Sequence, residues 1–388
     1  MIPAVDNWKV ARLGEKAYEV RDLYEPSDKE YLPYIGLEHI EQQTLTISDI
    51  GSSADTVSTK KYFKKGDILF GSLRPYFRKV VRPRFNGVCS TDITVIRANP
   101  GTNQEFLNYF IAAPSFIAHA SNISSGTRMP RANWKVLSES KWLFPPLPTQ
   151  NKIASILSAY DDLIENNLKR IKILEEMAQM IYREWFVNFR FSGHEKVKMV
   201  KSELGMIPEG WEVKKLGDFM ELAYGKALKA DDRRDGKVPV FGSGGICGYH
   251  DKALVKGPGI IVGRKGNVGS VFWSDDDFYP IDTVFYVKTE LELHYVYYNL
   301  LNQNFFNTDA AVPGLNRNQA YSNKFLHPDE VLMKTFAEFI NAIFEQKKTL
   351  KVKNDNLRKT RDLLLPKLIS GEIDVEGLDI STSHEVTI

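Results

Sequence analysis

At 388 residues the chain is longer than one ordinary hydrophobic core supports, so we expect two or more domains. Its 51 basic and 49 acidic residues give a net charge of +2, too small to indicate a nucleic-acid partner by itself. Cys89 and Cys247 lie far apart without a partner motif, which argues against a disulfide framework or a zinc site. The sequence lacks a secretory pattern and any apolar run of the roughly 20 residues that a membrane helix needs, so we expect a cytoplasmic protein.

The first predicted domain covers residues 1–149. Trp8 opens the motif WKVARLGE, and short β-branched and aromatic runs bounded by Gly, Pro, Asn and Asp follow it. Such runs are typical of β-strands, whereas residues 105–120 are typical of a short helix. We therefore predict a mainly-β domain with few helices.

A long helix is predicted next, over residues 150–188. Three prolines in FPPLPTQNKIASIL precede it, and Thr149 is placed to cap its start. A helix of this length is either a coiled-coil partner or a helix packed on its own domain, and the 4,3 spacing of its residues favours the coiled coil. The seam residues are Ile153, Leu157, Tyr160, Ile164, Asn167, Ile171, Leu174, Ala178, Ile181 and Trp185.

The second half of the chain repeats the order of the first. After a linker, 189–208, a second mainly-β domain is predicted over 209–333, and Trp211 opens it with WEVKKLGD as Trp8 opens the first. Glycine-rich stretches follow in both halves, and then Asp92 and Asp282 stand at like positions before apolar runs. Self-similarity over half of the chain indicates a duplicated unit.

A second long helix, 334–370, keeps the register of the first. Its seam residues are Phe336, Ile340, Ile343, Leu350, Leu357, Leu364 and Leu368. Polar seam residues, among them Asn167, Lys347, Asn354 and Arg361, are expected to fix register at some cost in stability. Gly371 follows as a stop signal, and the tail 371–388 is expected to be partly disordered.

Basic and aromatic residues cluster in the loops of the first domain. Arginine matches phosphates and guanine edges, and aromatic rings stack on bases, so these loops are candidates for DNA contact. The alternative is a solvated hairpin edge whose basic residues discourage aggregation. The candidates are Arg74, Tyr76, Arg78, Lys79, Arg128 and Arg131.

Loops at corresponding places in the second domain are rich in Asn and Arg, which are side-chain types suited to reading adenine and guanine edges. In both halves these loops are poor in acids, which makes a chance occurrence less plausible. The candidates are Arg264, Lys265, Asn267, Asn316, Arg317 and Asn318.

Several short motifs resemble catalytic sites only in part. FGSGG, residues 241–245, resembles the glycine-rich loop of methyltransferases, but no Rossmann-type unit surrounds it. Pro328-Asp329 followed by EQK only loosely matches a nuclease pattern. No Walker motif or histidine pair with metal-ligand spacing occurs, so no ATP or metal site is predicted. These considerations favour a binding protein without catalytic residues.

The order of motifs resembles the specificity subunits of type I restriction–modification systems. In the first half it rests on GDILFGSLRPYFRKV, SSGTRMPRANW, FPPLPTQNKIASIL and the helix DDLIENNLKRIKILEEMAQMIYREWF. In the second half it rests on GYHDKALVKGPGIIVGRKGNVGSVFW and LLLPKLISGEIDV. The resemblance covers essentially all of residues 1–375. One departure is that FLHPDEVLMKTFAEFI stands where a proline run would precede the second helix.

The resemblance implies an α+β fold of two repeated, mainly-β target-recognition domains, separated by two long helices in an antiparallel coiled coil. It further implies a bipartite double-stranded DNA target, one half for each domain. Two modification subunits would methylate adenine N6 with S-adenosylmethionine, and two restriction subunits would add ATP- and Mg-dependent translocation and cleavage. This chain would then hold no cofactor and no catalytic residue. For docking the modification subunits we expect exposed helix faces with Tyr182, Trp185 and Phe186; coiled-coil core is an equal alternative for Trp185.

Three alternatives stay open from the sequence. The same architecture could serve a methyltransferase without a nuclease, which neighbouring genes would distinguish. A coiled-coil scaffold whose β domains bind protein or carbohydrate would show no salt-dependent DNA affinity. An enzyme acting alone would show activity in the isolated chain, and we rank this last.

Overall fold

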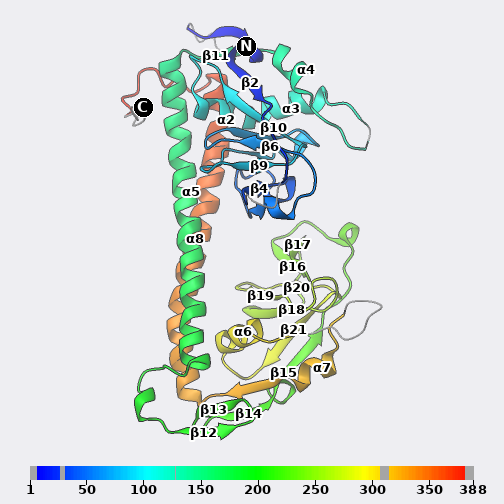
Figure 1. Ribbon diagram of the computed structural model, residues 1–388, viewed down its shortest axis with the longest axis vertical. Helices are drawn as coiled ribbons and strands as arrows, with labels where there is room; N and C mark the ends of the chain where they lie inside the picture. The colour runs from blue at the N-terminus through cyan, green and yellow to red at the C-terminus, as the bar shows by residue number, and fades with distance from the viewer. Residues whose placement is uncertain (1–6, 27–30, 127, 306–313, 381–388) are drawn as a thin grey trace. The chain divides into compact units, whose positions relative to one another are not determined.

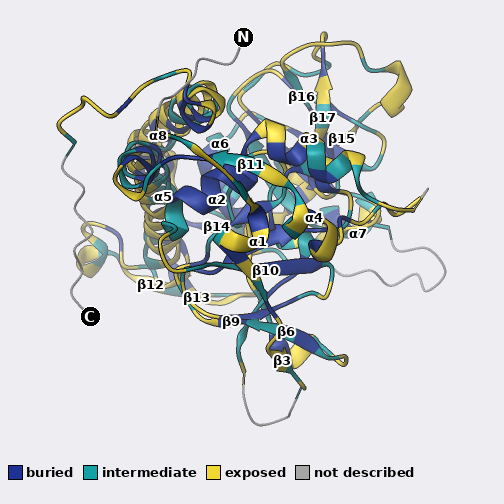
Figure 2. Cartoon of the chain, turned by 90° about the horizontal axis from the view of Figure 1, so that it is seen from above, coloured by how far each residue is buried: buried dark blue, intermediate teal, exposed yellow. Residues whose placement is uncertain are grey.

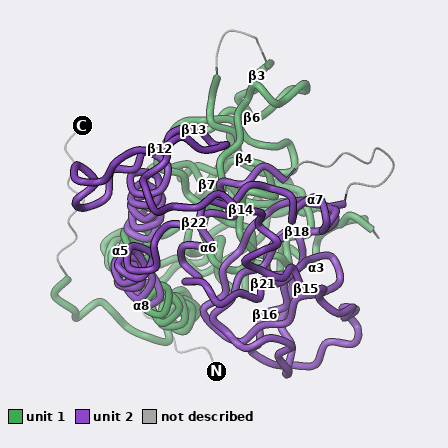
Figure 3. The backbone as a smooth tube through the Cα atoms, turned by 90° about the horizontal axis from the view of Figure 1, so that it is seen from below, with its two compact units in different colours: residues 1–168, 351–388 green, residues 169–350 purple. Residues whose placement is uncertain are grey.

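The computed structural model describes residues 7–26, 31–126, 128–305 and 314–380 (Figure 1). The chain forms two compact units, residues 1–168 with 351–388 and residues 169–350 (Figure 3). Each unit contains one part of each long helix. The unit boundaries therefore fall inside the two long helices.

The first unit is built on a four-stranded antiparallel sheet in the order β2-β10-β7-β8. A five-stranded sheet, β3-β6-β9-β4-β5, and a β1-β11 pair complete it. Its strands are β1 (Lys9–Arg12), β2 (Ala17–Val20), β3 (Leu23–Tyr24), β4 (Pro33–Ile35), β5 (Gly51–Ser52), β6 (Lys60–Phe63), β7 (Ile68–Gly71), β8 (Val80–Val81), β9 (Gly87–Cys89), β10 (Ile93–Ala98) and β11 (Lys141–Phe144). Its short helices are α1 (Leu13–Lys16), α2 (Gln104–Ala112), α3 (Pro114–Asn122) and α4 (Trp134–Glu139).

The second unit repeats this plan. Its four-stranded sheet has the order β15-β21-β18-β19, and a β14-β22 pair and a three-stranded sheet, β17-β16-β20, accompany it. Its strands are β12 (Met199–Ser202), β13 (Gly205–Pro208), β14 (Glu212–Lys215), β15 (Met220–Tyr224), β16 (Val238–Gly242), β17 (Gly245–His250), β18 (Gly259–Gly263), β19 (Val271–Ser274), β20 (Tyr279–Pro280), β21 (Val284–Thr289) and β22 (Lys324–His327). Its short helices are α6 (Leu293–Leu301) and α7 (Arg317–Ser322). The predicted α+β class and internal repeat are confirmed.

Strand register gives a residue-by-residue equivalence between the units. Gly71 pairs with Ile93 in the first sheet, and Gly263 pairs with Val284 in the second. Asp92 therefore corresponds to Thr283, so the expectation that Asp92 and Asp282 are equivalent was wrong by one residue.

The long helices are α5 (Leu147–Tyr182), of 36 residues, and α8 (Glu330–Ser370), of 41 residues. A π-helical turn, Arg183–Val187, continues α5. Thr149 was expected to cap α5, but the helix already begins at Leu147, with Pro148 in the first turn where its missing N–H costs nothing. The hydroxyl of Thr149 donates instead to Glu376 at 3.4 Å. Gly371 follows α8 with a φ of 76°, as a C-terminal stop requires.

The two long helices run antiparallel within each unit. In the first unit Asp161 of α5 pairs with Arg361 of α8, and Asn167, further along α5, contacts Asn354, which is earlier on α8. In the second unit Glu175 pairs with Lys347 at 2.8 Å. Every residue of the predicted seam is buried or half-buried. The 4,3 spacing thus marks the helix faces that pack together.

Each unit has its own hydrophobic core. Buried residues are dark blue in Figure 2. In the first, α2, α3 and the sheet pack with Leu157 of α5 and Leu365 and Leu368 of α8. In the second, Phe336 and Ile340 of α8 pack among aromatic residues. Both helices bury part of their length in each core, so neither unit is complete without both.

The predicted linker and tail contain ordered structure. Residues 189–208 include the antiparallel pair β12-β13. In the tail, Val375 is buried in the first core, and Lys152 donates to the carbonyl of Glu376 at 2.7 Å. Residues 381–388 lie outside the described residues.

Both short motifs that partly resemble catalytic sites, FGSGG and Pro328-Asp329, have structural roles. Gly242 and Gly245 of FGSGG pair where β16 turns into β17. The carboxylate of Asp329 accepts from the amides of Val331 and Leu332, at 2.7 and 3.1 Å, at the start of α8. An acid in this position satisfies N–H groups that a helix start leaves unpaired.

Candidate nucleic-acid interface

Two loops of the first unit lie side by side. Leu73, just after β7, forms an antiparallel bridge with Arg131, and the amide of Arg74 donates to the carbonyl of Pro130 at 2.8 Å. The guanidinium of Arg74 also donates to the carbonyl of Arg128 at 3.2 Å. Arg74, Arg128 and Arg131 are exposed, so the two predicted basic loops form one surface.

A strained turn presents Tyr76 on this surface. Residues Pro75–Phe77 form a single 3-10 turn between Arg74 and Arg78, whose φ angles of 52° and 50° are left-handed. Such angles are uncommon outside glycine and persist only where surrounding contacts impose them. The Tyr76 ring is 47% exposed and packs on Phe77, with ring centroids 4.6 Å apart. The turn therefore offers an aromatic ring in a fixed place.

Two of the predicted DNA-contacting residues, Arg78 and Lys79, lie largely inside the fold. Arg78 is only 7% exposed, and Asp362 and two backbone carbonyls accept hydrogen bonds from its guanidinium. Burial, partly offset by Asp362, lowers the pKa of Arg78, a change too small to discharge an arginine. Lys79 is half-buried, its ammonium donates to the carbonyl of Leu37, and burial lowers its pKa. Neither is a free surface cation.

The remaining first-unit candidates differ in their partners. Arg131 forms an ion pair with Asp92 at 2.7 Å, although its side chain is 55% exposed. Among the described residues, Arg74 has no carboxylate partner. Arg74, Tyr76 and Arg128 are thus the best-placed side chains of this loop surface.

The second unit joins two loops in the same way. Lys265, just after β18, forms an antiparallel bridge with Gly314, and the amide of Leu315 donates to the carbonyl of Arg264 at 2.8 Å. These contacts match those of Leu73 and Ala132 in the first unit, where the amide of Ala132 donates to Ser72 at 2.9 Å. The backbone framework of the loop surface is therefore repeated.

Two arginines of these second-unit loops lie on one tyrosine. The guanidinium carbons of Arg264 and Arg317 lie 4.9 and 5.0 Å from the centre of the Tyr224 ring, which is 49% exposed. Arg264 also donates to the carbonyl of Asp282 at 3.0 Å. Cation–π contact holds both cations at the end of β15. Sequence reasoning missed Tyr224, whose only signal is an exposed aromatic residue at a strand end.

All three asparagine candidates are exposed, and one of them, Asn316, also caps a helix. The side-chain oxygen of Asn316 accepts from the amides of Asn318 and Gln319 at the start of α7, as that of Asn133 does from Lys135 at the start of α4. Lys265, Asn267 and Asn318 are exposed. Asn316 therefore caps α7, whether or not it also contacts a base.

Neither a metal centre nor a membrane span is found in the described parts of the chain. There, no group of three or more His, Cys, Asp or Glu could hold a metal ion. No helix in the same residues is long and apolar enough to cross a membrane.

Comparison with known proteins identifies the family. The model of the type I restriction modification DNA specificity domain matches residues 6–176 and 208–319, well over half of the chain. The chain therefore belongs to the family of type I restriction–modification specificity subunits, which carry this domain.

Curated relatives agree over most of the chain. The type I restriction enzyme MjaIX specificity subunit of Methanocaldococcus jannaschii is 26% identical over 352 residues, 82% of this chain and 80% of that protein. The HindI specificity subunit of Haemophilus influenzae is 24% identical over 460 residues, 95% of this chain and 100% of that protein. Among solved structures, the S subunit of a type I restriction-modification system from M. genitalium matches with a TM-score of 0.53 and 17% identity, covering 95% of this chain and 97% of the other. At that identity the match supports the fold alone.

Proposed function

We propose that this chain reads a bipartite DNA sequence, one half with each unit, and directs adenine-N6 methylation and restriction by partner subunits. The repeated loop surface supports the proposal most strongly. In the first unit a backbone bridge joins the segment after β7 to the segment before α4. In the second unit a bridge joins the segment after β18 to the segment before α7. Each surface combines arginines with an exposed tyrosine, Tyr76 or Tyr224. Arginine and an aromatic ring are suited to phosphates, guanine edges and base faces.

The side chains on the two frameworks differ at equivalent positions. By backbone pairing, Ser72 corresponds to Arg264, and Arg131 corresponds to Gly314. After the capping asparagines, Trp134 of the first unit corresponds to Arg317 of the second. A common framework with different side chains fits two units that read different base sequences. It also fits a target whose two halves are unlike.

Burial limits the number of cations available to phosphates. Of the basic candidates in the first unit, Arg78 is buried and Lys79 is half-buried. A small number of exposed cations, with a net charge of +2, keeps binding to unrelated DNA weak. Specificity then depends on base contacts and on partner subunits that add affinity.

An exposed apolar stripe on α5 supports docking of a modification subunit. Ile173, Met177 and Met180 are 54%, 42% and 59% exposed and follow one another at helical spacing. Tyr182 and Phe186, which we had expected at the docking surface, are buried in the second core. We propose that two modification subunits carry S-adenosylmethionine and the catalytic groups, and that two restriction subunits carry the ATP- and Mg-dependent activity. This chain would be the non-catalytic reader.

The first test is methylation sequencing in a host without adenine methylation. The host would carry this chain with its neighbouring modification gene, or the modification gene alone. We expect N6-methyladenine at one split sequence only when both proteins are present. The pattern of methylated sites would give both half-sites and the gap directly.

A negative result would be equally informative. If both proteins are soluble and associated and no new methylation arises, the reader function is wrong and the scaffold alternative gains. Methylation without cleavage, in a host that also carries the neighbouring restriction gene, would point to a modification-only system.

A further inference from the structure

Arg78 joins the strained turn of the first unit to the long helices. Its Nε donates to the carbonyl of Ala112 at 2.7 Å, and Nη1 donates to the carbonyl of Gln43 at 3.3 Å. Its Nη2 contacts Oδ1 of Asp362, on α8, at 3.2 Å. The three donors thus contact three different segments, a geometry that the planar fork of arginine provides and lysine does not.

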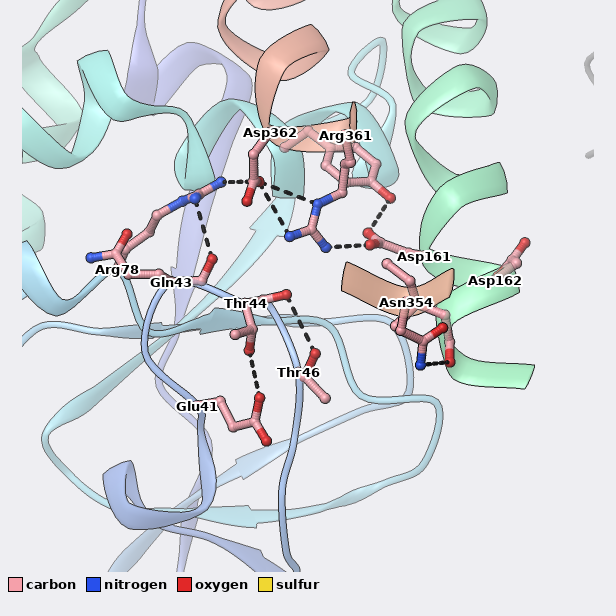
Figure 4. Close-up of polar contacts among 12 residues, drawn as sticks. Glu41, Gln43, Thr44, Thr46, Arg78, Asp161, Asp162, Asn354, Arg361 and Asp362 are labelled. Carbon is pink, nitrogen blue, oxygen red and sulfur yellow. Dashed lines mark hydrogen bonds and ion pairs between the residues drawn. The ribbon is translucent and has the colours of Figure 1, made fainter. Parts of the chain in front are cut away.

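The carboxylate of Asp362, which is 36% exposed, belongs to a partly buried chain of charges (Figure 4). The same Oδ1 also accepts from Nη2 of Arg361 at 3.2 Å, and Arg361, which is only 1% exposed, pairs in turn with Asp161 on α5. The Tyr109 hydroxyl of α2 donates to Asp161 at 2.6 Å. A continuous set of charged and polar contacts therefore connects the turn, α2, α5 and α8 inside the first unit.

Gln43 holds the other side of the turn. Its amide donates to the carbonyl of Phe77 at 3.3 Å, and its side chain donates to the carbonyl of Tyr76 at 3.2 Å. Gln43 itself has a left-handed φ of 67°. Three non-glycine residues in this conformation, at Gln43, Arg74 and Arg78, surround one exposed tyrosine. Strain of this kind needs outside support, and Arg78 contacts both the turn and Gln43.

We propose that Arg78 is a positioning residue for DNA reading: by anchoring the Pro75–Phe77 turn to α8 through Asp362, it sets where Tyr76 and Arg74 meet a base pair. The inference rests on the proposed reader function and deepens it. Arg78 contacts no DNA in this scheme. It acts through the turn, and the long helices serve as the fixed reference for that turn.

The energetics agree with a positioning role. The Arg78–Asp362 ion pair is partly buried, and such a pair gains little net stability because desolvation of its charges offsets their attraction. Replacing Arg78 with methionine leaves Asp362 paired with Arg361, so no carboxylate loses its last partner. The substitution should therefore loosen the turn while the unit stays folded.

The test compares Arg78→Met with Arg84→Met in the complex with the modification subunit. Arg84 is the matched control because it lies on the same segment and pairs with Asp162 and Glu165 of α5, outside the turn. Methylation is measured on DNA carrying every single-base change in both half-sites. We expect Arg78→Met to lose about tenfold in discrimination between the correct and the wrong base, at positions within one half-site only. A loss of this size corresponds to one side chain that no longer reads its base. Arg84→Met should lose no discrimination.

Two further readouts separate positioning from other roles. The slope of log binding constant against log salt concentration should be unchanged in Arg78→Met, because no phosphate contact is removed. If that slope falls by about 0.9 while discrimination stays intact, Arg78 is a phosphate contact and the proposal is overturned. Arg78→Lys, which keeps the charge but not the fork, should restore discrimination only in part. Full restoration would show that charge alone matters and would also overturn it.

Hydrogen exchange tests the inference without DNA. The amides of Gln43, Phe77 and Arg78 should exchange several-fold faster in Arg78→Met than in Arg84→Met, while the α2 amides stay protected. Equal exchange in the two variants would overturn the positioning role. If the wild-type complex methylates nothing, the reader function fails, and the exchange experiment still decides whether Arg78 holds the turn.

Discussion

Asn167 and Asn354 meet side chain to side chain between the antiparallel helices of the first unit: Nδ2 of Asn167 donates to Oδ1 of Asn354 at 2.8 Å. Asn354 is 2% exposed, and its own Nδ2 reaches the carbonyl of Ile164 at 3.4 Å. The seam residues next to this pair, Ile164, Ile171, Leu350 and Leu357, are apolar, so the pair is satisfied in one register only. A one-turn slip would leave both amides facing apolar side chains, at a cost of about 1–3 kcal/mol for each unpaired group.

Replacement of Asn354 with alanine should therefore destabilise the first unit by about 1–3 kcal/mol, because Asn167 loses its partner. Denaturant unfolding would measure the change. Asn356→Ala, at an exposed position on the same helix, is the control and should change stability by less than about 0.5 kcal/mol. Equal effects would argue that the pair adds nothing specific.

Leucine at both Asn167 and Asn354 should not lower stability. The double variant Asn167→Leu/Asn354→Leu removes both polar groups and adds apolar contact, so the unfolding midpoint should stay level or rise. The double variant should no longer be held in a single helix register, and NMR signals from the seam residues should then be doubled or broadened. Sharp, single signals would contradict the register role.

Helix faces could be predicted from the sequence because burial along a helix follows spacing. The 4,3 pattern located the seam residues, including Lys347 and Arg361, whose partners the sequence did not reveal. Those partners, Glu175 and Asp161, lie 172 and 200 residues away in the chain. The start of α5 was misplaced by a few residues because Pro148 fits the first turn of a helix as readily as the segment before it.

The candidate interface was predictable in outline and not in detail. Composition located the two loops in each unit, yet only tertiary contacts decide which cations face solvent. Arg74 and Arg78 are four residues apart in one basic segment, and one is exposed while the other is 7% exposed. Tyr224 was missed because a tyrosine ending a strand is typical of any sheet.

A buried histidine should make the second unit sensitive to acid. His294 stacks on Trp273, with ring centroids 4.6 Å apart, and burial lowers its pKa to about 4, against a smaller opposing effect of Asp275. The unfolded chain, with a histidine pKa of about 6.5, binds the proton more readily than the folded one. Stability from this group is therefore complete above about pH 6.5 and falls as the pH drops toward 4, by up to about 3 kcal/mol.

His294→Phe should keep the stacking and remove the titration. Thermal midpoints of both proteins, followed from about pH 7.5 to about pH 4.5, should fall less steeply in the variant, because protonation no longer favours its unfolded state. Parallel curves would show that other groups govern the acid sensitivity of the second unit.

Salt dependence should identify the phosphate contacts of the first unit. Replacing Arg74 or Arg128 with alanine should weaken DNA binding by the complex and lower its salt slope by about 0.9 for each phosphate that is no longer neutralised. Arg12→Ala is the control, since Arg12 is similarly exposed but lies on β1 and pairs with Glu139. If the slopes of Arg74→Ala, Arg128→Ala and Arg12→Ala all equal that of the wild type, this loop surface does not contact phosphates.

Tyr224 should matter to the second half-site through its ring. Tyr224→Ala removes the surface on which Arg264 and Arg317 lie, so both guanidiniums gain freedom and methylation of the target should fall about tenfold or more. Tyr224→Phe keeps the ring and should retain most activity. Tyr249→Ala, which removes a tyrosine of similar exposure from β17, should leave activity unchanged.

The gap between half-sites should respond to helix length. The Asn167–Asn354 contact sets which residues are opposite, so 165–171 of α5 correspond to 350–356 of α8. Deleting both heptads together also removes the Asn167–Asn354 pair. It keeps the 4,3 spacing of the seam, spares the Arg361–Asp161 and Lys347–Glu175 pairs, and removes about 10 Å of each helix. If continuous helices set the spacing of the target, methylation sequencing should show the same two half-sites with a gap shorter by about three base pairs.

Deleting one heptad only, from α5, is the control for this experiment. It leaves the seam residues of α8 without matching partners, so folding or methylation should be lost, while the gap should not shorten cleanly. A paired deletion that alters the half-site sequences themselves would contradict the separation of reading from spacing, because the loop surfaces are untouched by the change. An unaltered gap in an active paired variant would show that the partner subunits, not the helices of this chain, determine the distance between half-sites.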